Sequence, residues 1–187
     1  MAHQVCPPWV GYFLLNPLRK LFENPNKMLG PFVREGMTVL EPGCGMGYFT
    51  LPLARMVGPE GRVVAVEIQE KMLSVLARRA RKAGLNDRID IRHIADPDLG
   101  IGDLLNKVDF AAAIHVVHEV LDQAVFFLEI WEALKPGGKM LVLEPKGHIS
   151  QGEFDQTMAT AIQAGFKPEA APIKHGSRER LLIKELL

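Results

Sequence analysis

Two carboxylic acids at the ends of neighbouring apolar segments, with a glycine-rich turn between them, are the residues of this chain best suited to hold a ligand. The first apolar segment ends at Glu41, and Gly43, Gly45 and Gly47 follow it; the second ends at Glu67. Glycine lets a backbone approach a ligand where side chains would block it. In open α/β sheets, a glycine turn after one strand and an acid at the tip of the next hold the ribose of a nucleoside cofactor. The sequence therefore predicts such a site here.

The spacing of the glycines indicates which kind of nucleoside fits. A dinucleotide site needs two residues between its second and third glycines, so that a helix N-terminus faces the pyrophosphate. Here Gly45 and Gly47 are separated by one residue only. Glu41 also places a carboxylate close to where a diphosphate would lie, and it suits a cationic ligand better. A nicotinamide-dependent oxidoreductase is therefore the weaker alternative.

Apolar segments alternate with helical patterns along most of the chain. Strands are expected near 37–41, 63–67, 89–94, 108–114 and 139–144, and helices near 47–57, 70–84, 122–135 and 153–164. This alternation predicts a parallel sheet with helices on both faces. Pro52 is expected to make the first of these helices short or bent. Two last segments, 166–173 and 178–186, are joined by too few residues for a parallel crossover, so they are expected to pair antiparallel.

Composition narrows the class of protein. With 187 residues and 48% hydrophobic content, the chain suits a single domain, 1–187, made of an N-terminal helical cap or lid at 1–35 and a catalytic α/β core at 36–187. The 22 acidic and 22 basic residues balance, so no basic excess indicates nucleic-acid binding. No signal peptide or membrane-spanning segment is recognisable, which favours the cytoplasm. No Cys/His cluster has metal-ligand spacing, so no metal is expected.

Four motifs in order carry a family resemblance. The segment Glu41 to Gly47 resembles the first motif of the class I S-adenosylmethionine-dependent methyltransferases, and Glu67 matches the acid of the family's second strand. Val108-Asp109-Phe110 resembles the start of its fourth strand, and 134–139 the turn before its fifth. The resemblance implies a Rossmann-like methyltransferase fold. That fold is a doubly wound, seven-stranded, mostly parallel sheet whose last strand is antiparallel and lies between the fifth and sixth.

The resemblance also assigns roles within the glycine turn. The backbone of Gly43 and Gly45 should border the methionyl part of S-adenosylmethionine, and Gly47 completes this cofactor-binding turn. Glu41 should help to hold the cofactor's amino group, directly or through water. Glu67 should accept hydrogen bonds from both ribose hydroxyls. A structural tight turn and an ordinary strand-end acid are the alternatives.

Three further residues are implied for the adenine. Ile68 and Met72 are placed to sandwich the base, and Asp96 to accept a hydrogen bond from its amino group. Met72 also has the spacing of a core residue, so packing without ligand contact is the alternative. Asp96 precedes Pro97, where an Asx-type turn is natural.

The methyl acceptor is expected over the carboxyl ends of the fourth and fifth strands, where open α/β sheets bind ligands. His115 is the first choice for a site residue, close to the cofactor's methionyl end, and His148 is the candidate base. His118 matches a family position that usually packs. A base is needed only if the acceptor must lose a proton.

The expected activity is methyl transfer by in-line displacement to a small molecule, leaving S-adenosylhomocysteine. Neither a recognition domain nor a basic surface for a macromolecular or membrane partner is visible. Trp9, Tyr12 and Phe13 form either a lid over the acceptor or a buried apolar patch. A non-catalytic S-adenosylmethionine-binding or regulatory protein is the second alternative. The sequence leaves the acceptor's identity and the oligomeric state open.

Overall fold

The structure is a computed structural model that describes residues 23–94, 98–145, 147–170 and 178–185. The chain divides after Ile94 into two compact units, called here the N-terminal unit and the C-terminal unit. Residues 1–22 lie outside the described part, and so do Trp9, Tyr12 and Phe13, which were expected to form either a lid or a buried apolar patch. The organisation as one domain with a cap at 1–35 stays a prediction.

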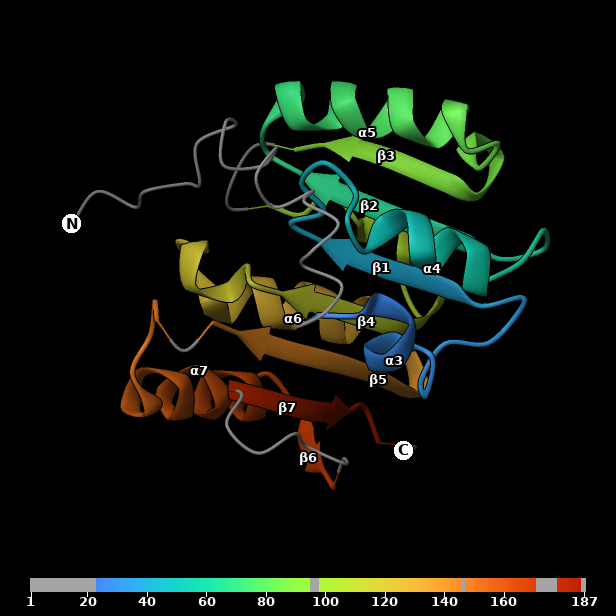
Figure 1. Cartoon of the computed structure of the whole chain (residues 1–187). Helices are drawn as coiled ribbons and strands as arrows, with labels where there is room; N and C mark the ends of the chain where they lie inside the picture. The colour runs from blue at the N-terminus through green and yellow to red at the C-terminus, as the bar shows by residue number, and fades with distance from the viewer. Residues whose placement is uncertain (1–22, 95–97, 146, 171–177, 186–187) are drawn as a thin grey trace. The chain divides into compact units, whose positions relative to one another are not determined.

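The N-terminal unit is built on three parallel strands. Its elements are α3 (Pro25–Leu29), β1 (Thr38–Pro42), α4 (Thr50–Met56), β2 (Arg62–Glu67), α5 (Glu70–Lys82), the 3₁₀ turn η1 (Asn86–Arg88) and β3 (Ile89–His93). The strand order is β3-β2-β1, with Val39 beside Val63 and Val63 beside Ile89. Helix α4 packs on β2, and α5 packs on β2 and β3 (Figure 1). Because all three strands are parallel, their carboxyl ends meet at one edge of this sheet.

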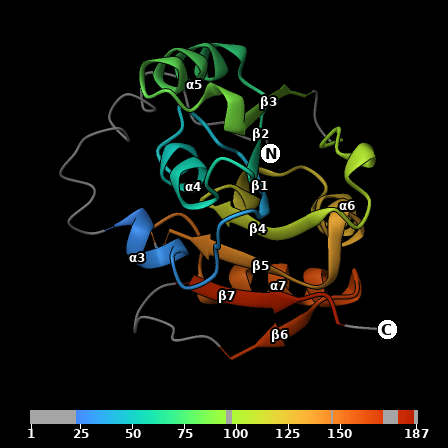
Figure 2. The same ribbon diagram turned by 90° about the vertical axis from the view of Figure 1, so that its right-hand side faces the viewer.

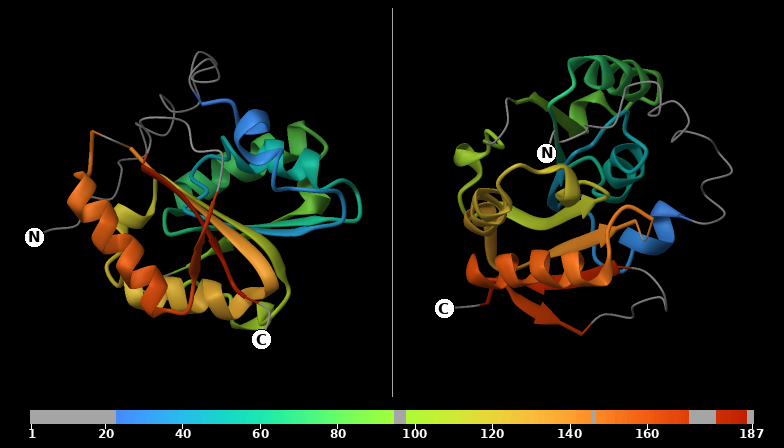
Figure 3. Two further views of the ribbon diagram at one scale, coloured as in Figure 1. Left: turned by 90° about the horizontal axis from the view of Figure 1, so that it is seen from below. Right: turned by 90° about the vertical axis from the view of Figure 1, so that its left-hand side faces the viewer.

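The C-terminal unit contains the other four strands. Its elements are η2 (Gly102–Leu104), β4 (Val108–Ile114), η3 (Val117–Glu119), α6 (Gln123–Ala133), β5 (Leu134–Glu144), α7 (Gln151–Gln163), β6 (Lys167–Glu169) and β7 (Arg178–Ile183). Strand β5 is parallel to β4, whereas β7 is antiparallel to β5 and to β6, between which it lies (Figure 2). Helices α6 and α7 contact each other, and their axes cross (Figure 3).

The predicted fold class is confirmed. Seven strands, mostly parallel, alternate with helices, and the last strand is antiparallel and lies between the fifth and sixth. The expected pairing of the two last segments is also confirmed, although β6 is only three residues long. Among the described residues, no helix has both the length and the apolar character that crossing a membrane requires.

Two boundaries differ from the prediction for identifiable reasons. Helix α4 begins at Thr50 and not near residue 47, so Pro52 falls in its first turn, where a missing N–H costs nothing. Strand β5 begins at Leu134, because the segment 134–139 that was expected as a turn is the irregular first part of the strand. Its register with β4 shifts between the pairs Val108–Leu134 and Phe110–Lys139.

Candidate functional site

The glycine turn after β1 has the backbone conformation that its sequence predicts. Gly43, Gly45 and Gly47 have φ values of 69°, 53° and 82°, in the left-handed region that other residues rarely adopt. A Cβ atom on Gly47 would lie 2.4 Å from Cδ1 of Leu76 on α5. The amides of Gly43 and Cys44 donate to the carbonyl oxygen of Val66 on β2, at 2.8 and 3.1 Å. Backbone contacts with β2 and packing against α5 therefore fix the shape of this turn.

Glu67 links the tip of β2 to the same turn. Its Oε2 accepts a hydrogen bond from the amide of Gly45 at 3.0 Å, and its Oε1 accepts from the amides of Ile68 and Gln69 at 2.9 and 3.0 Å. Burial raises the pKa of Glu67, although these three amides and the nearby His93 lower it. Three of the roughly four acceptor positions of a carboxylate are thus in use. One acceptor position, on Oε2, remains for the two ribose hydroxyls that were predicted to bond to Glu67, and this role stays a prediction.

Glu41 lies at the tip of β1 with 4% of its surface exposed. Its Oε2 and the hydroxyl of Thr50 have no hydrogen-bond partner among the described residues. Burial raises its pKa to about 8; Thr50 partly opposes this shift, and the nearby Glu67 adds to it. An unpartnered buried carboxyl oxygen is costly unless a ligand satisfies it. The ammonium group of an amino acid supplies what this oxygen lacks, so the residues present fit the amino group of S-adenosylmethionine.

The three residues predicted to contact adenine differ in burial and in whether the structure describes them. Ile68 follows Glu67 and is half-buried. Met72 is 4% exposed and lies in a buried cluster with Met46 and Val75, so in this structure it acts as a packing residue. Asp96 lies outside the described residues. Contact of Ile68, Met72 and Asp96 with adenine stays a prediction.

His115 and His148 belong to the C-terminal unit, near the carboxyl ends of β4 and β5. His115 follows β4 with a φ of 58°, a strained value for a residue other than glycine, and its amide donates to Leu143 at 2.7 Å. His148 is exposed and lies in the loop after β5. The roles assigned to both, as well as the contact of His115 with the cofactor, stay predictions.

The carboxyl ends of β4 and β5 also contain a hydrogen-bonded pair that the sequence did not single out, His118 and Glu144. Nδ1 of His118 lies 2.5 Å from Oε2 of Glu144, and the amide of Val117 donates to Oε1 of Glu144 at 2.7 Å. The rings of His118 and His148 meet edge to face, with centroids 5.4 Å apart. The signal was present in the sequence, since Glu144 ends β5 and His118 follows the adjacent parallel strand β4. Periodicity alone, however, does not pair side chains that are 26 positions apart.

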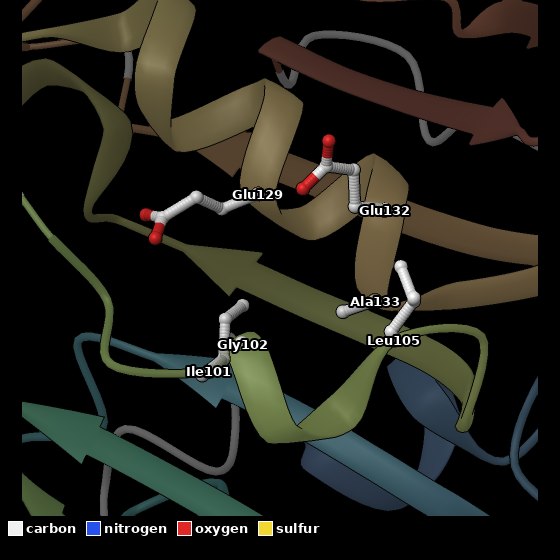
Figure 4. A pocket seen from close by; sticks show the side chains of 6 residues that line it. All are labelled: Ile101, Gly102, Leu105, Glu129, Glu132 and Ala133. Atoms are coloured by element: carbon white, nitrogen blue, oxygen red, sulfur yellow. The ribbon is translucent and has the colours of Figure 1, made fainter.

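A shallow cavity of about 50 Å³ lies elsewhere in the C-terminal unit (Figure 4). Glu129 and Glu132 of α6 border it, together with Ile101, Gly102, Leu105 and Ala133. It contains none of the predicted site residues, and it has room for only a few water molecules. Because Oε2 of Glu129 accepts a hydrogen bond from the amide of Leu99 at 3.0 Å, the acid has a structural role.

The fold and the glycine turn define a class of protein, and comparison with known proteins agrees. The chain belongs to the class I S-adenosylmethionine-dependent methyltransferases: residues 33–176 match the family described as "Methyltransferase domain". This confirms the family predicted from the four motifs. The matches do not favour the oxidoreductase or the non-catalytic alternative.

Curated relatives carry different methyltransferase names. The chain is 33% identical over 133 residues to the ubiquinone/menaquinone biosynthesis C-methyltransferase UbiE of Hahella chejuensis, with 70% of this chain and 53% of the relative covered. It is 34% identical over 129 residues to the protein-L-isoaspartate O-methyltransferase of Triticum aestivum, with 67% and 52% covered. The chain therefore spans about half the length of the curated relatives it matches.

Solved structures support the fold. A SAM-dependent methyltransferase from Aquifex aeolicus matches with a TM-score of 0.83 at 23% identity, covering 96% of this chain and 98% of the other. A protein from Methanococcus maripaludis, described as a putative S-adenosyl-L-methionine-dependent methyltransferase, matches with a TM-score of 0.76 at 17% identity, covering 99% and 97%.

Proposed function

We propose that this chain transfers the methyl group of S-adenosylmethionine to a small-molecule acceptor. The observation that carries the proposal is the pair of buried acids, Glu41 and Glu67, on the two sides of a glycine turn with three left-handed residues. In the proposed complex, Glu41 binds the amino group of the methionyl part and Glu67 binds the ribose. Gly43 and Gly45 bring backbone close to the methionyl part.

The protein's contribution to the reaction is mainly positional. When bound, the cofactor supplies an electrophilic methyl group on a positively charged sulfur. Holding an acceptor about 3 Å from such a group, in a site without water, contributes roughly 7–11 kcal/mol in favourable cases. His115 and His148, near the carboxyl ends of β4 and β5, are candidate contacts for the acceptor.

The balance of charged residues is what favours a small molecule as the acceptor. The chain has as many acidic as basic residues, 22 of each, which does not favour nucleic acid or an anionic membrane as a partner. One relative is named for C-methylation in quinone biosynthesis and another for O-methylation of isoaspartate in protein, so their names support methyl transfer without agreeing on an acceptor. The proposed location is the cytoplasm.

The test is transfer of a labelled methyl group to a panel of small thiols, amines, phenols and carboxylic acids. We expect label in at least one acceptor class and equimolar S-adenosylhomocysteine. A folded protein that binds the cofactor but labels no acceptor would be a binding or regulatory protein. A protein that does not bind the cofactor at millimolar concentration would contradict the proposal altogether.

A further inference from the structure

The carboxylate of Glu67 holds the glycine turn through one hydrogen bond that differs in kind from its other two. Oε1 accepts from the amides of Ile68 and Gln69, which directly follow Glu67 in the chain. Oε2 accepts at 3.0 Å from the amide of Gly45, which lies 22 positions away in the turn after β1. The first two bonds shape the chain around Glu67 itself, whereas the third joins two separate segments of the N-terminal unit.

The bond to Gly45 competes with the role predicted for Glu67. A carboxylate offers about four acceptor positions, and backbone amides use three of them here. Two ribose hydroxyls need two acceptors, so Glu67 is one short while all three amides stay bonded. The amides of Ile68 and Gln69 move together with Glu67, because they are its neighbours in the chain. The amide of Gly45 is therefore the donor that can leave.

The glycine turn has anchors that do not depend on this bond. The amides of Gly43 and Cys44 both donate to the carbonyl oxygen of Val66 on β2, at 2.8 and 3.1 Å. A Cβ atom placed on Gly45 would meet Sδ of Met72 at 3.7 Å, which is an ordinary contact distance, so side chains do not clamp this residue. Glycine also reorients its backbone at a low steric cost. The Gly45 amide can therefore turn away from its acceptor while the rest of the turn stays in place.

A released Gly45 amide needs a new acceptor. A backbone N–H that loses its partner in a site shielded from water costs free energy, and a charged acceptor is the strongest replacement. The methionyl part of the cofactor, which is proposed to lie against Gly45, carries a carboxylate. A ligand with both a ribose and such a carboxylate replaces both halves of the bond between Gly45 and Glu67. A plain nucleoside replaces only one half.

We propose that the hydrogen bond between Gly45 and Glu67 is a latch that cofactor binding opens by exchange. Oε2 of Glu67 passes to the ribose hydroxyls, and the amide of Gly45 passes to the cofactor's carboxylate. This inference rests on the proposed methyl transfer and deepens it, because it makes recognition of the cofactor's two ends one coupled event. The site then selects ligands that carry both a ribose and a carboxylate, and it discriminates against nucleosides without an amino-acid part.

The first test detects the hydrogen bonds one by one. Scalar couplings across hydrogen bonds, from each amide ¹⁵N to the carboxyl ¹³C of Glu67, are measured by NMR on the deuterated whole chain. Without ligand, we expect correlations from Gly45, Ile68 and Gln69. With saturating S-adenosylhomocysteine that carries ¹³C in its carboxyl group, the Gly45 correlation should move from Glu67 to the ligand. The correlations of Ile68 and Gln69 should stay, and they serve as internal controls.

The second test measures the coupling by calorimetry. S-adenosylhomocysteine, its analogue without the carboxyl group, and the 2′-deoxy and 3′-deoxy forms of both are titrated into the chain. With the carboxyl group present, loss of either hydroxyl should weaken binding about tenfold or more, because a hydrogen bond to a carboxylate is lost. Without the carboxyl group the latch stays closed and leaves one acceptor position. Loss of one of the two hydroxyls should then change the affinity by less than about threefold.

The two proposals fail in different ways. A Gly45 correlation to Glu67 that persists with bound ligand, or that is missing before ligand is added, would overturn the latch and leave the proposed methyl transfer standing. Equal losses of affinity in the two ligand series, which independent recognition of the two ends predicts, would do the same. Absence of any binding at millimolar ligand would instead contradict the proposed function, and the latch would fall with it.

Discussion

The carboxyl group of Glu41 has a different protonation state in this fold from that of an ordinary glutamate. It is buried at the tip of β1 with one oxygen unpartnered, and its pKa is raised to about 8, chiefly by burial. Near neutral pH it is therefore mostly the neutral acid in the protein without cofactor. A cationic ligand that pairs with it would shift it to the carboxylate.

This protonation makes stability depend on pH in a definite direction. Between pH 4.5 and 8, the folded protein keeps a proton on Glu41 that the unfolded chain releases, so the free energy of unfolding falls as pH rises. The total loss is up to about 5 kcal/mol at 1.36 kcal/mol per pKa unit. We expect Glu41→Gln to unfold at higher denaturant concentration than the unmodified chain at pH 8, and to lack this slope. Glu60→Gln, an exposed acid of the same unit, is the control. Equal pH dependence in Glu41→Gln would contradict the assignment.

Cofactor binding should release the same proton. If Glu41 pairs with the cofactor's ammonium group, the affinity for S-adenosylmethionine should fall by up to about tenfold per unit as pH drops from 7.5 to 5.5. Calorimetry in two buffers of different ionisation enthalpy measures the released proton. Glu41→Gln should bind more weakly at pH 7.5 and release none. An affinity that does not change with pH would mean that Glu41 does not meet the ammonium group.

Residues with local sequence signals were easier to predict than side-chain pairs. The positive φ values of Gly43, Gly45 and Gly47 follow from their spacing after an apolar strand. The contact of His118 with Glu144 depends instead on which strands are neighbours, and no local pattern around either residue indicates its partner.

At the scale of elements, the sequence locates the ends of a strand more accurately than it shows which side of a helix faces the core. The strand β4 was predicted to the residue, because an apolar run is bounded clearly at both ends. On α6 and α7, the apolar residues Leu128 and Ile162 adjoin buried positions, yet they are 46% and 48% exposed. Adjacent apolar residues on an amphipathic helix cannot all face the core. Periodicity alone does not decide which of them is exposed to solvent.

The close packing of the glycine turn against α5 gives a prediction at this scale. Gly47→Ala would place a Cβ 2.4 Å from Leu76 and 3.0 Å from Leu51, at a φ of 82°. The left-handed conformation alone costs roughly 1–2 kcal/mol, and the overlap adds to it. We expect denaturant unfolding to show a loss of about 2–4 kcal/mol, with weaker cofactor binding. Gly152→Ala on α7, where nothing lies within 4 Å, should instead stabilise the chain by about 0.5–1 kcal/mol. Equal stability of the two variants would contradict the packing argument.

At the scale of the whole molecule, the order of strands was the most informative prediction. An antiparallel last strand between the fifth and sixth distinguishes this fold from a dinucleotide-binding domain, and β7 has that position. The predicted site residues are distributed over the two units. Glu41, Gly45 and Glu67 belong to the N-terminal unit, and the histidines His115 and His148 to the C-terminal unit. The connection at Asp96 lies outside the described residues.

Family membership rests on this whole-chain pattern more than on any residue. The match to the methyltransferase domain covers 33–176, which includes both units. The acceptor could not be derived at this scale, because methyl transfer needs few dedicated groups and relatives of similar identity bear different acceptor names. The identity of the acceptor therefore has to come from labelling experiments.

Calorimetric titration of the folded chain with S-adenosylmethionine, and in parallel with NADH, tests the central claim most directly. We predict saturable binding of S-adenosylmethionine and none of NADH. Glu67→Gln should bind at least about tenfold more weakly, because the amide nitrogen that replaces one carboxylate oxygen cannot accept a ribose hydroxyl. Glu67→Ala is the harsher variant, since it also removes the acceptors of three amides that shape the turn. Glu60→Gln should bind like the unmodified chain. Binding of NADH, or no heat with millimolar S-adenosylmethionine, would contradict the account.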